Sequence, residues 1–331
     1  MEYIITQTSM FSSEFIYNET NSKDSFENLT TAPKPVLSKY YPYLATELGF
    51  SILCSTILIL VYVIIGEHKT LPGKNVICIS MNLIVTYILL TIDLLMRNRI
   101  PHSICFIMGV TVQVTFLATF FWTNVMSYDI MRTMASVKPE TIGTSKFWKY
   151  SAYAWLMTLI CVLPAVVIDL TEAVPEEYRP KFGVKKCWLS GQLSFLLYFN
   201  LPVGLTLASN CIFFALTART IVRVRSATAI LAANRHKKRF RLCMKLVLIM
   251  GLVWITEFVP WLTGIYYLYA IAGMLNCLHG VYLFLIFVCK RRILKQVAAN
   301  LVCHSASGTP PPIKKKQSPS LDTITTNVSN I

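Results

Sequence analysis

The segment RTIVRVRSATAILAANRHKKRFR (Arg219–Arg241) is a basic run that leads into two long apolar segments, the second of which ends in CKRR. The segments cover Leu242–Tyr267 and Leu268–Cys289. Each is long enough to cross about 30 Å of hydrocarbon as a helix. Because almost no loop separates them, they predict a helical hairpin whose two basic ends lie on the same side of a membrane. The excess of Lys and Arg marks that side as the cytosol.

The composition agrees with a membrane protein. Of the 331 residues, 54% are apolar and only 14% are charged, which is unlike a soluble globular domain. The net charge of +15 is distributed between the apolar segments instead of covering one face of a domain. We therefore expect contacts with anionic membrane lipids and acidic partners, and no binding of nucleic acid.

Seven membrane-spanning helices are predicted, so the expected fold is an all-α seven-helix bundle. The spans before the hairpin are Tyr41–Ile65, Lys74–Met96, Ser103–Met131, Phe147–Leu170 and Leu193–Ala218. An odd number of spans puts the termini on opposite sides. With the N-terminus outside, most of the 31 Lys and Arg residues are cytosolic, as the positive-inside rule requires. The domains are then an extracellular tail (1–40), a bundle (41–289) and a cytosolic tail (290–331).

The predicted topology gives meaning to two sequons and two cysteines. Asn18 and Asn28 each begin an Asn-X-Thr sequon in the polar tail, which we expect to be disordered. The sequons are either glycosylated or present by chance. Cys105 and Cys187 are the only two of the ten cysteines on the oxidising side. We expect a disulfide between them, the alternative being two free thiols.

The remaining cysteines fall into two groups. Cys289 and Cys303 flank a basic patch at the cytosolic face and are candidates for palmitoylation. Those inside the spans are interpreted as ordinary core packing: Cys54, Cys78, Cys161, Cys211 and Cys277.

Polar residues inside the spans are costly in hydrocarbon, so we expect them to face the interior of the bundle. They are Glu47, Asn82, Asp93, Gln113, Asn124, Asn200, Asn210, Glu257, Asn276 and His279. Some of the polar and aromatic side chains share one face of the sixth or the seventh span, and Trp188 lies in the outer loop before the fifth span. Together they could line a ligand pocket. Its candidates are Trp188, Trp254, Glu257, Trp261, Asn276 and His279. The alternative is a buried structural network.

The sequence does not indicate an enzyme. Only one of its five histidines lies in a span, and neither a Gly-rich phosphate loop nor a paired nucleophile and base is apparent. No cofactor or metal site is expected.

Five local sequences carry a resemblance to a known class of receptors. Cys187-Trp188 and LNCLHGVYLFLIFVCKRR (Leu275–Arg292) resemble the second outer loop and seventh span of the secretin and adhesion class of G-protein-coupled receptors. FFWTNVMSYDIMRTM (Phe120–Met134), KFWKYSAYAW (Lys146–Trp155) and RLCMKLVLIMGLVWITE (Arg241–Glu257) are similar to the insect Methuselah-like receptors of that class.

The resemblance implies a plasma-membrane receptor that passes an extracellular signal to a heterotrimeric G protein. The ligand is unknown, and a peptide is one candidate. The inner ends of the third, fifth and sixth spans would receive the G protein. The residues implied for this contact are Tyr128, Arg132, Arg241, Lys245 and Arg292. The basic loop Arg219–Lys245 is either a partner surface or a simple topological anchor.

Two other functions remain open. Methuselah-like receptors usually carry a large cysteine-rich ectodomain, whereas residues 1–40 contain no cysteine, so we expect that domain to be lacking. A non-signalling scaffold or decoy is therefore the alternative function. A seven-span channel or transporter would need a polar track through the bundle, and few polar residues lie in the inner half of the spans.

Overall fold

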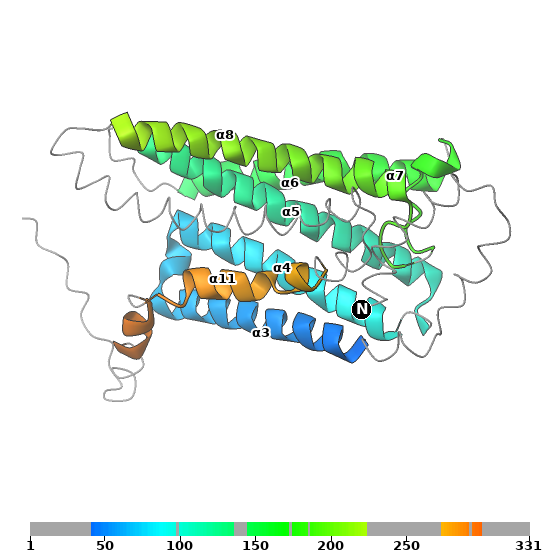
Figure 1. Ribbon diagram of the computed structural model, residues 1–331, viewed down its shortest axis with the longest axis horizontal. Coiled ribbons are helices and arrows are strands. Elements are labelled where there is room, and N and C mark those ends of the chain that lie inside the picture. The colour runs from blue at the N-terminus through cyan, green and yellow to red at the C-terminus, as the bar shows by residue number, and fades with distance from the viewer. Residues whose placement is uncertain are drawn as a thin grey trace, which may run out of the picture.

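The computed structural model describes residues 41–96, 99–135, 144–171, 174–184, 186–223, 273–290 and 293–299. Over these ranges long helices lie side by side along one axis (Figure 1). The long helices are α3 (Tyr41–Ile65), α4 (Leu71–Met96), α5 (His102–Ala135), α6 (Thr144–Thr171) and α8 (Leu201–Arg223). The shorter ones are η1 (Glu67–Lys69), η3 (Glu176–Tyr178), α7 (Gln192–Phe195), η4 (Leu196–Asn200) and α11 (His279–Phe287).

Five helices in the described ranges are long and apolar enough to cross a membrane. They match the first five predicted spans within a few residues, which confirms an all-α membrane bundle. The predicted sixth span and the first residues of the seventh lie outside the described ranges. The rest of the seventh is helical at 273–277 and in α11. The seven-span count and the orientation of the termini stay predictions.

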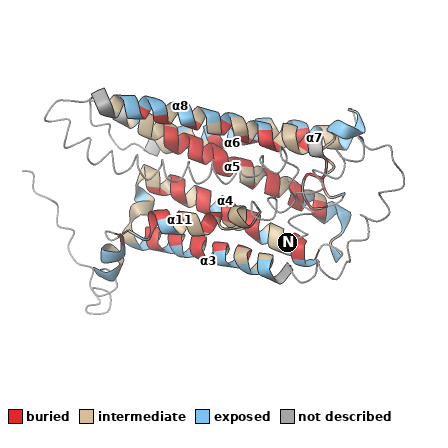
Figure 2. Ribbon diagram, viewed as in Figure 1, coloured by how far each residue is buried: buried red, intermediate tan, exposed pale blue. Residues whose placement is uncertain are grey.

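Helix α5 is the centre of the described bundle. In its most apolar part 67% of the residues are buried, compared with 22% in α6. It contacts α4 on one side and α6 and α8 on the other, while α3 packs on α4 and α11. Buried residues accordingly follow the helix sides that face other helices (Figure 2). We refer below to the helices on one side as the α3–α4–α11 group and to α5 with the helices on its other side as the α5–α6–α8 group, and the two groups pack directly against each other through α4 and α5.

The fifth predicted span is not a uniform α-helix. Between α7 and α8 the chain forms the five-residue π-helical turn η4, which ends two residues before Pro202. Such wide turns commonly occur at functional sites. One prediction about core packing is wrong: Cys211 is exposed on α8, where it faces the surroundings of the bundle instead of its interior.

The two ends of the bundle carry different features. The disulfide end is where α4 and α6 finish and where α5 and α7 begin, and it carries Cys105. The Arg132 end is where α5 and α8 finish and where α4 and α6 begin, and it carries Arg132 in the last turns of α5.

Candidate functional site

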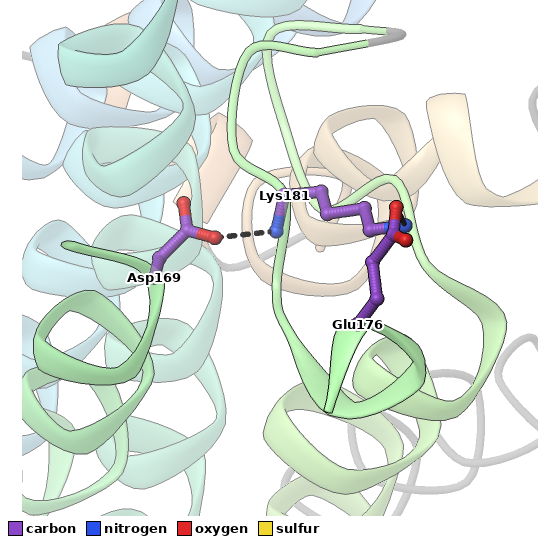
Figure 3. Close-up of polar contacts among 3 residues, drawn as sticks. All are labelled: Asp169, Glu176 and Lys181. Carbon is purple, nitrogen blue, oxygen red and sulfur yellow. Dashed lines mark hydrogen bonds and ion pairs between the residues drawn. The ribbon is translucent and has the colours of Figure 1, made fainter. Parts of the chain in front are cut away.

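The loop that follows α6 is held against the bundle by Asp169. Its Oδ1 accepts the backbone N–H of Lys181 at 2.7 Å (Figure 3). Its Oδ2 accepts the backbone N–H of Phe182 at 3.0 Å. Lys181 has a φ of 53°, a left-handed conformation that costs a non-glycine residue about 1–2 kcal/mol. The two hydrogen bonds to Asp169 offset this cost, so the carboxylate determines the local path of the loop.

The same lysine also forms an ion pair within the loop. Lys181 Nζ lies 2.8 Å from Glu176 Oε1, and the side chains point toward one another in Figure 3. This hydrogen bond lowers the pKa of the exposed Glu176 carboxyl. Because the glutamate is exposed to solvent, the pair adds little to stability.

A disulfide and a glycine bring the loop onto α5. The predicted disulfide between Cys105 and Cys187 is confirmed. A side chain at Gly109 would place its Cβ 2.9 Å from the Cys187 carbonyl oxygen, so only glycine permits this approach. The ring of Phe182 is buried beside it and makes an edge contact with Phe106, with centroids 5.9 Å apart.

Trp188, the first of the predicted pocket residues, inserts between α5 and η4. Its Nε1 donates to Gln113 Oε1 at 2.7 Å. Its ring stacks on Phe116 with centroids 5.3 Å apart and makes edge contacts with Phe199 and Phe195 at 5.0 and 5.3 Å. A half-buried indole with a satisfied N–H is held firmly in place.

Gln113 is predicted to lie in the interior of the bundle but is not among the predicted pocket residues. It is fully buried, and its Nε2 donates to the carbonyl oxygen of Tyr198 at 2.8 Å. Pro202 has no N–H, so it cannot bond to the carbonyl four residues before it, which is that of Tyr198. Gln113 therefore links Trp188 to a carbonyl that proline frees. The sequence prediction missed this role, and the signal that could have identified it is a glutamine in one apolar span together with a proline in another.

Asn276 and His279, two further predicted pocket residues, lie beside α4. The Tyr87 hydroxyl donates to the carbonyl oxygen of Asn276 at 3.1 Å. His279 is only 4% exposed, and its Nε2 has no hydrogen-bond partner among the residues that are described. A buried ring nitrogen without a partner is costly, and such groups mark positions where a ligand or a water molecule binds.

A contact between α4 and α5 fixes the relative depth of these residues. The hydroxyl oxygens of Thr86 and Thr115 are 2.6 Å apart. Tyr87 directly follows Thr86, and Gln113 precedes Thr115 by two residues, which is about 3 Å along a helix. Trp188, which bonds to Gln113, therefore lies at nearly the same level of the bundle as Tyr87 and its partner Asn276.

Helix α11 packs very closely on α3. The helix is interrupted at Leu278, and the Ser51 hydroxyl donates to the Cys277 carbonyl at 2.5 Å. A Cβ on Gly280 would lie 2.5 Å from both the Ser51 carbonyl oxygen and the Ser55 hydroxyl. Small residues on both helices thus bring the two backbones together, as is usual in membrane bundles.

At the Arg132 end, two of the residues predicted to contact a G protein are described. Tyr128 makes edge contacts with Phe213 of α8 and Tyr150 of α6, with ring centroids 5.6 and 6.3 Å apart. The Tyr150 hydroxyl donates to Asp129 Oδ1 at 3.0 Å. Arg132 lies one turn beyond Tyr128 and is exposed.

Deeper in the bundle, Asn124 joins α5 to two other helices. Its Nδ2 donates to Ser209 Oγ at 2.5 Å and to Asn210 Oδ1 at 3.0 Å. Its Oδ1 accepts the Tyr153 hydroxyl at 3.0 Å. Asn124 and Asn210 are 4% and 1% exposed, so these bonds lie in a largely apolar environment. They hold α5, α6 and α8 together as one unit.

Of the remaining predicted site residues, the structure describes only some. Cys289, a predicted palmitoylation site, is exposed just after α11. Nine predicted positions lie outside the described residues: Asn18, Asn28, Arg241, Lys245, Trp254, Glu257, Trp261, Arg292 and Cys303.

One cluster has the composition of a metal site. A carboxylate oxygen of Asp93 and the sulfurs of Cys105 and Cys187 lie within 4.8 Å of one another, the only such group in the described ranges. The two sulfurs are bonded to each other, so neither is a thiolate that could coordinate a metal ion.

The chain is similar to one family of membrane receptors. The family model described as "7 transmembrane receptor (Secretin family)" matches residues 40–283. This range contains α3, α4, α5, α6 and α8 together with the disulfide and Trp188.

Among the relatives is "G-protein coupled receptor Mth2" of Drosophila simulans, which is 26% identical over 299 residues, 85% of this chain and 55% of the relative. "G-protein coupled receptor Mth" of Drosophila melanogaster is 28% identical over 73% of this chain and 49% of the relative. "Probable G-protein coupled receptor Mth-like 10" of the same species is 25% identical, with shares of 85% and 52%. The chain spans about half the length of the curated relatives it matches.

Proposed function

The chain belongs to the secretin family of seven-transmembrane receptors, and we propose that it transmits an extracellular signal to a heterotrimeric G protein in the plasma membrane. Its relatives are Methuselah-type receptors, as the local sequences predicted. The observation that carries the proposal is the arrangement of α5. One end of this helix holds the disulfide-linked loop, and the other end presents Arg132.

The ligand pocket that we propose lies near the disulfide end, between Trp188 and His279. Trp188 offers an aromatic face on a loop that is pinned by a covalent bond and by Asp169. His279 offers a buried nitrogen at about the same depth. An aromatic wall with a few convergent polar groups is typical of binding sites in receptors and enzymes. Trp254, Glu257, Trp261 and Asn276 are the other residues that we propose for this pocket.

The signal would travel through the α5–α6–α8 group. Gln113 contacts the ligand-facing Trp188, and Asn124 bonds α5 to α6 and α8 three turns further along α5. Helix α5 runs continuously between them and is roughly 50 Å long, enough to cross the whole membrane. A ligand that prefers one packing of this group over another would shift the population of the state that binds a G protein.

The G-protein surface that we propose is the Arg132 end. Tyr128 and Arg132 are on α5, and Arg241, Lys245 and Arg292 are the cations that the sequence adds to the same surface. Cations at this end suit an acidic or carboxylate-terminated partner helix.

The test is basal guanine-nucleotide exchange on a panel of G proteins, measured in membranes that contain the full chain. Arg132→Glu and the double change of Arg241 and Lys245 to Glu should each reduce the exchange rate strongly. The matched control is Lys149→Glu, because Lys149 is an exposed cation at the same end but on α6. This variant should retain most of the activity.

The outcome of this test separates two functions. If Arg132→Glu abolishes the exchange and Lys149→Glu leaves it intact, the chain is a receptor that couples to a G protein. If the chain at the cell surface gives no exchange above empty membranes, a non-signalling scaffold becomes the better account. We also propose glycosylation at Asn18 and Asn28. A glycosidase-sensitive mass that disappears in the Asn→Gln variants would establish that the N-terminal tail is extracellular.

A further inference from the structure

A carboxylate on α3 is directed toward the helical segment that leads into α11. Glu47, Ser51 and Ser55 are spaced by four residues, so they share one face of α3. The Ser51 hydroxyl donates to the Cys277 carbonyl, and Ser55 Oγ lies beside Gly280. This face of α3 therefore packs on α11 and on the residues before it, as the two neighbouring ribbons show (Figure 1). Glu47 lies on the same face, one turn nearer the disulfide end.

The contact of Ser51 with Cys277 also sets the depth of Glu47 relative to His279. Glu47 precedes Ser51 by four residues, which is about 6 Å along α3, and His279 follows Cys277 by two residues, which is about 3 Å. The two residues are therefore separated by about 10 Å along the bundle. Tyr282 connects them, because its ring lies 6.4 Å from that of His279 and its hydroxyl interacts electrostatically with Glu47.

Glu47 and His279 each present a polar atom that the bundle does not use. Glu47 Oε2 and His279 Nε2 are buried, and neither has a hydrogen-bond partner in the part of the chain that the structure describes. An ionised carboxylate can only accept hydrogen bonds, and a neutral imidazole accepts at one of its nitrogens. A carboxylate within a membrane-spanning helix is costly and usually marks a functional site. Both groups are thus suited to a ligand that brings N–H donors and a positive charge.

We propose that the ligand pocket recognises a cationic group, an ammonium or a guanidinium, with Glu47 as its counter-ion and His279 as a further hydrogen-bond acceptor. This inference rests on the pocket proposed above and names the chemistry of its ligand. Trp188 agrees with it, because its N–H is already bonded to Gln113 and the indole therefore offers the pocket an aromatic face, which attracts cations.

The experiment compares charged probes with neutral analogues on the full chain in lipid nanodiscs, without a G protein. One pair is phenylpropylamine and phenylpropanol. The other is an acetylated alanine–arginine–alanine amide and the same peptide with citrulline in place of arginine. Binding is measured from the rise of the thermal unfolding midpoint with probe concentration. A hydrogen-bonded charge pair should make the charged member of at least one pair bind about ten- to a hundredfold more tightly than its neutral analogue.

Two variants locate the charge that is responsible. Glu47→Gln keeps the shape of the side chain but removes its charge, so the charged probe should bind only as tightly as the neutral one. Its unfolding midpoint without probe should stay the same or rise, because the carboxylate has no partner in the described bundle. Glu177→Gln is the matched control. It removes an exposed carboxylate from the loop at the same end and should retain the full preference for charge.

The outcomes separate the charge of the ligand from the existence of the pocket. Tight binding of both charged probes, or of the arginine peptide alone, supports the proposal and shows whether a small amine can replace a peptide. Equal binding of charged and neutral probes would overturn the cationic ligand and leave the pocket in place. No binding of either charged probe up to its solubility limit would also overturn it.

The variants give two further ways to overturn the proposal. One is a Glu47→Gln variant that retains the preference for charge. The other is a clear fall of its midpoint without probe, which would show that the carboxylate stabilises the fold. If Glu47→Gln is not obtained, the probe comparison on the unchanged protein decides. Because no G protein is present, these results do not depend on the outcome of the nucleotide-exchange test.

Discussion

The two helix groups of the bundle are held together in different ways. In the α5–α6–α8 group, side chains bond to other side chains across helices, as Asn124 does with Asn210 and Tyr153. In the α3–α4–α11 group, helices approach closely through small residues such as Gly280, and the side chains of Ser51 and Tyr87 bond across helices to backbone carbonyls. Several of its buried polar atoms have no hydrogen-bond partner among the described residues: Ser55 Oγ, Asn75 Nδ2 and Oδ1, Ser80 Oγ and His279 Nε2.

The difference suggests that the two groups respond differently to a ligand. Interhelical hydrogen bonds favour one relative position of the helices and disappear when it changes. Close contacts of small residues resist further approach but leave sliding and separation less restricted. A fixed group beside one that can repack is a suitable arrangement for a receptor with two conformations. Four substitutions test this comparison.

The largest effect is expected from Gly280→Ala. The added Cβ would meet the Ser51 carbonyl oxygen at 2.5 Å, so the backbones of α3 and α11 must move apart. Overpacking of this kind costs about 1–3 kcal/mol. The measurement is the thermal unfolding midpoint of the full chain in detergent. Gly49→Ala on α3 is the matched control, because no atom lies within 4 Å of its Cβ position. An equal fall in both midpoints would show that the close approach at Gly280 is unimportant.

Asn124→Leu should have the next largest effect. It removes the bonds to Ser209, Asn210 and Tyr153, and leaves the buried amide of Asn210 without this partner. At roughly 0.6 kcal/mol for an average interhelical bond in a membrane, the loss is about 1–2 kcal/mol. The same unfolding measurement checks it. A midpoint equal to that of the unchanged protein would mean that the α5–α6–α8 group is not fixed by these bonds.

Asn75→Leu should have the opposite sign. Asn75 is fully buried, and neither atom of its amide has a hydrogen-bond partner among the described residues. Replacing an unsatisfied amide with an apolar group of similar size is neutral or stabilising by up to about 1 kcal/mol. The unfolding midpoint should therefore stay the same or rise. A fall as large as that of Asn124→Leu would remove the distinction between the two helix groups.

The smallest effect is expected from Glu176→Gln, which lies outside both groups. The hydrogen bond from Lys181 lowers the pKa of Glu176, so the pair stabilises the fold above the ordinary carboxyl pKa. This contribution is lost as the pH falls through the lowered value. The unfolding midpoints of the variant and the unchanged protein should therefore differ slightly at neutral pH and converge in acid. A difference that grows in acid would contradict this sign.

The sequence predicted features that depend on one segment or on one pair of residues. The positions of the spans were predicted from the lengths of the apolar segments, and the first five predicted spans agree with the helices of the structure within a few residues. The disulfide followed from placing just two cysteines on the oxidising side, and it is present. The inward direction of Gln113, Asn124 and His279 followed from the cost of polar groups in hydrocarbon.

The sequence did not predict which polar residues have partners. Asn75 and Asn124 are both asparagines buried in spans, yet only Asn124 bonds to neighbouring helices. That difference depends on the rotation and depth of each helix relative to its neighbours, which a single sequence does not specify. The link from Gln113 to the carbonyl freed by Pro202 has the same origin.

Segment length, apolarity and cysteine placement were enough to predict that this chain has membrane-spanning helices and one disulfide, because each of these features belongs to a single segment or a single pair of residues. They did not predict that Trp188 meets Gln113, that Gly280 admits the backbone of α3, or that Asp93 faces the disulfide, which the packing of the helices decides. These contacts join residues from helices that lie far apart along the chain. They exist only once packing has fixed how each helix is turned and how deeply it sits in the bundle.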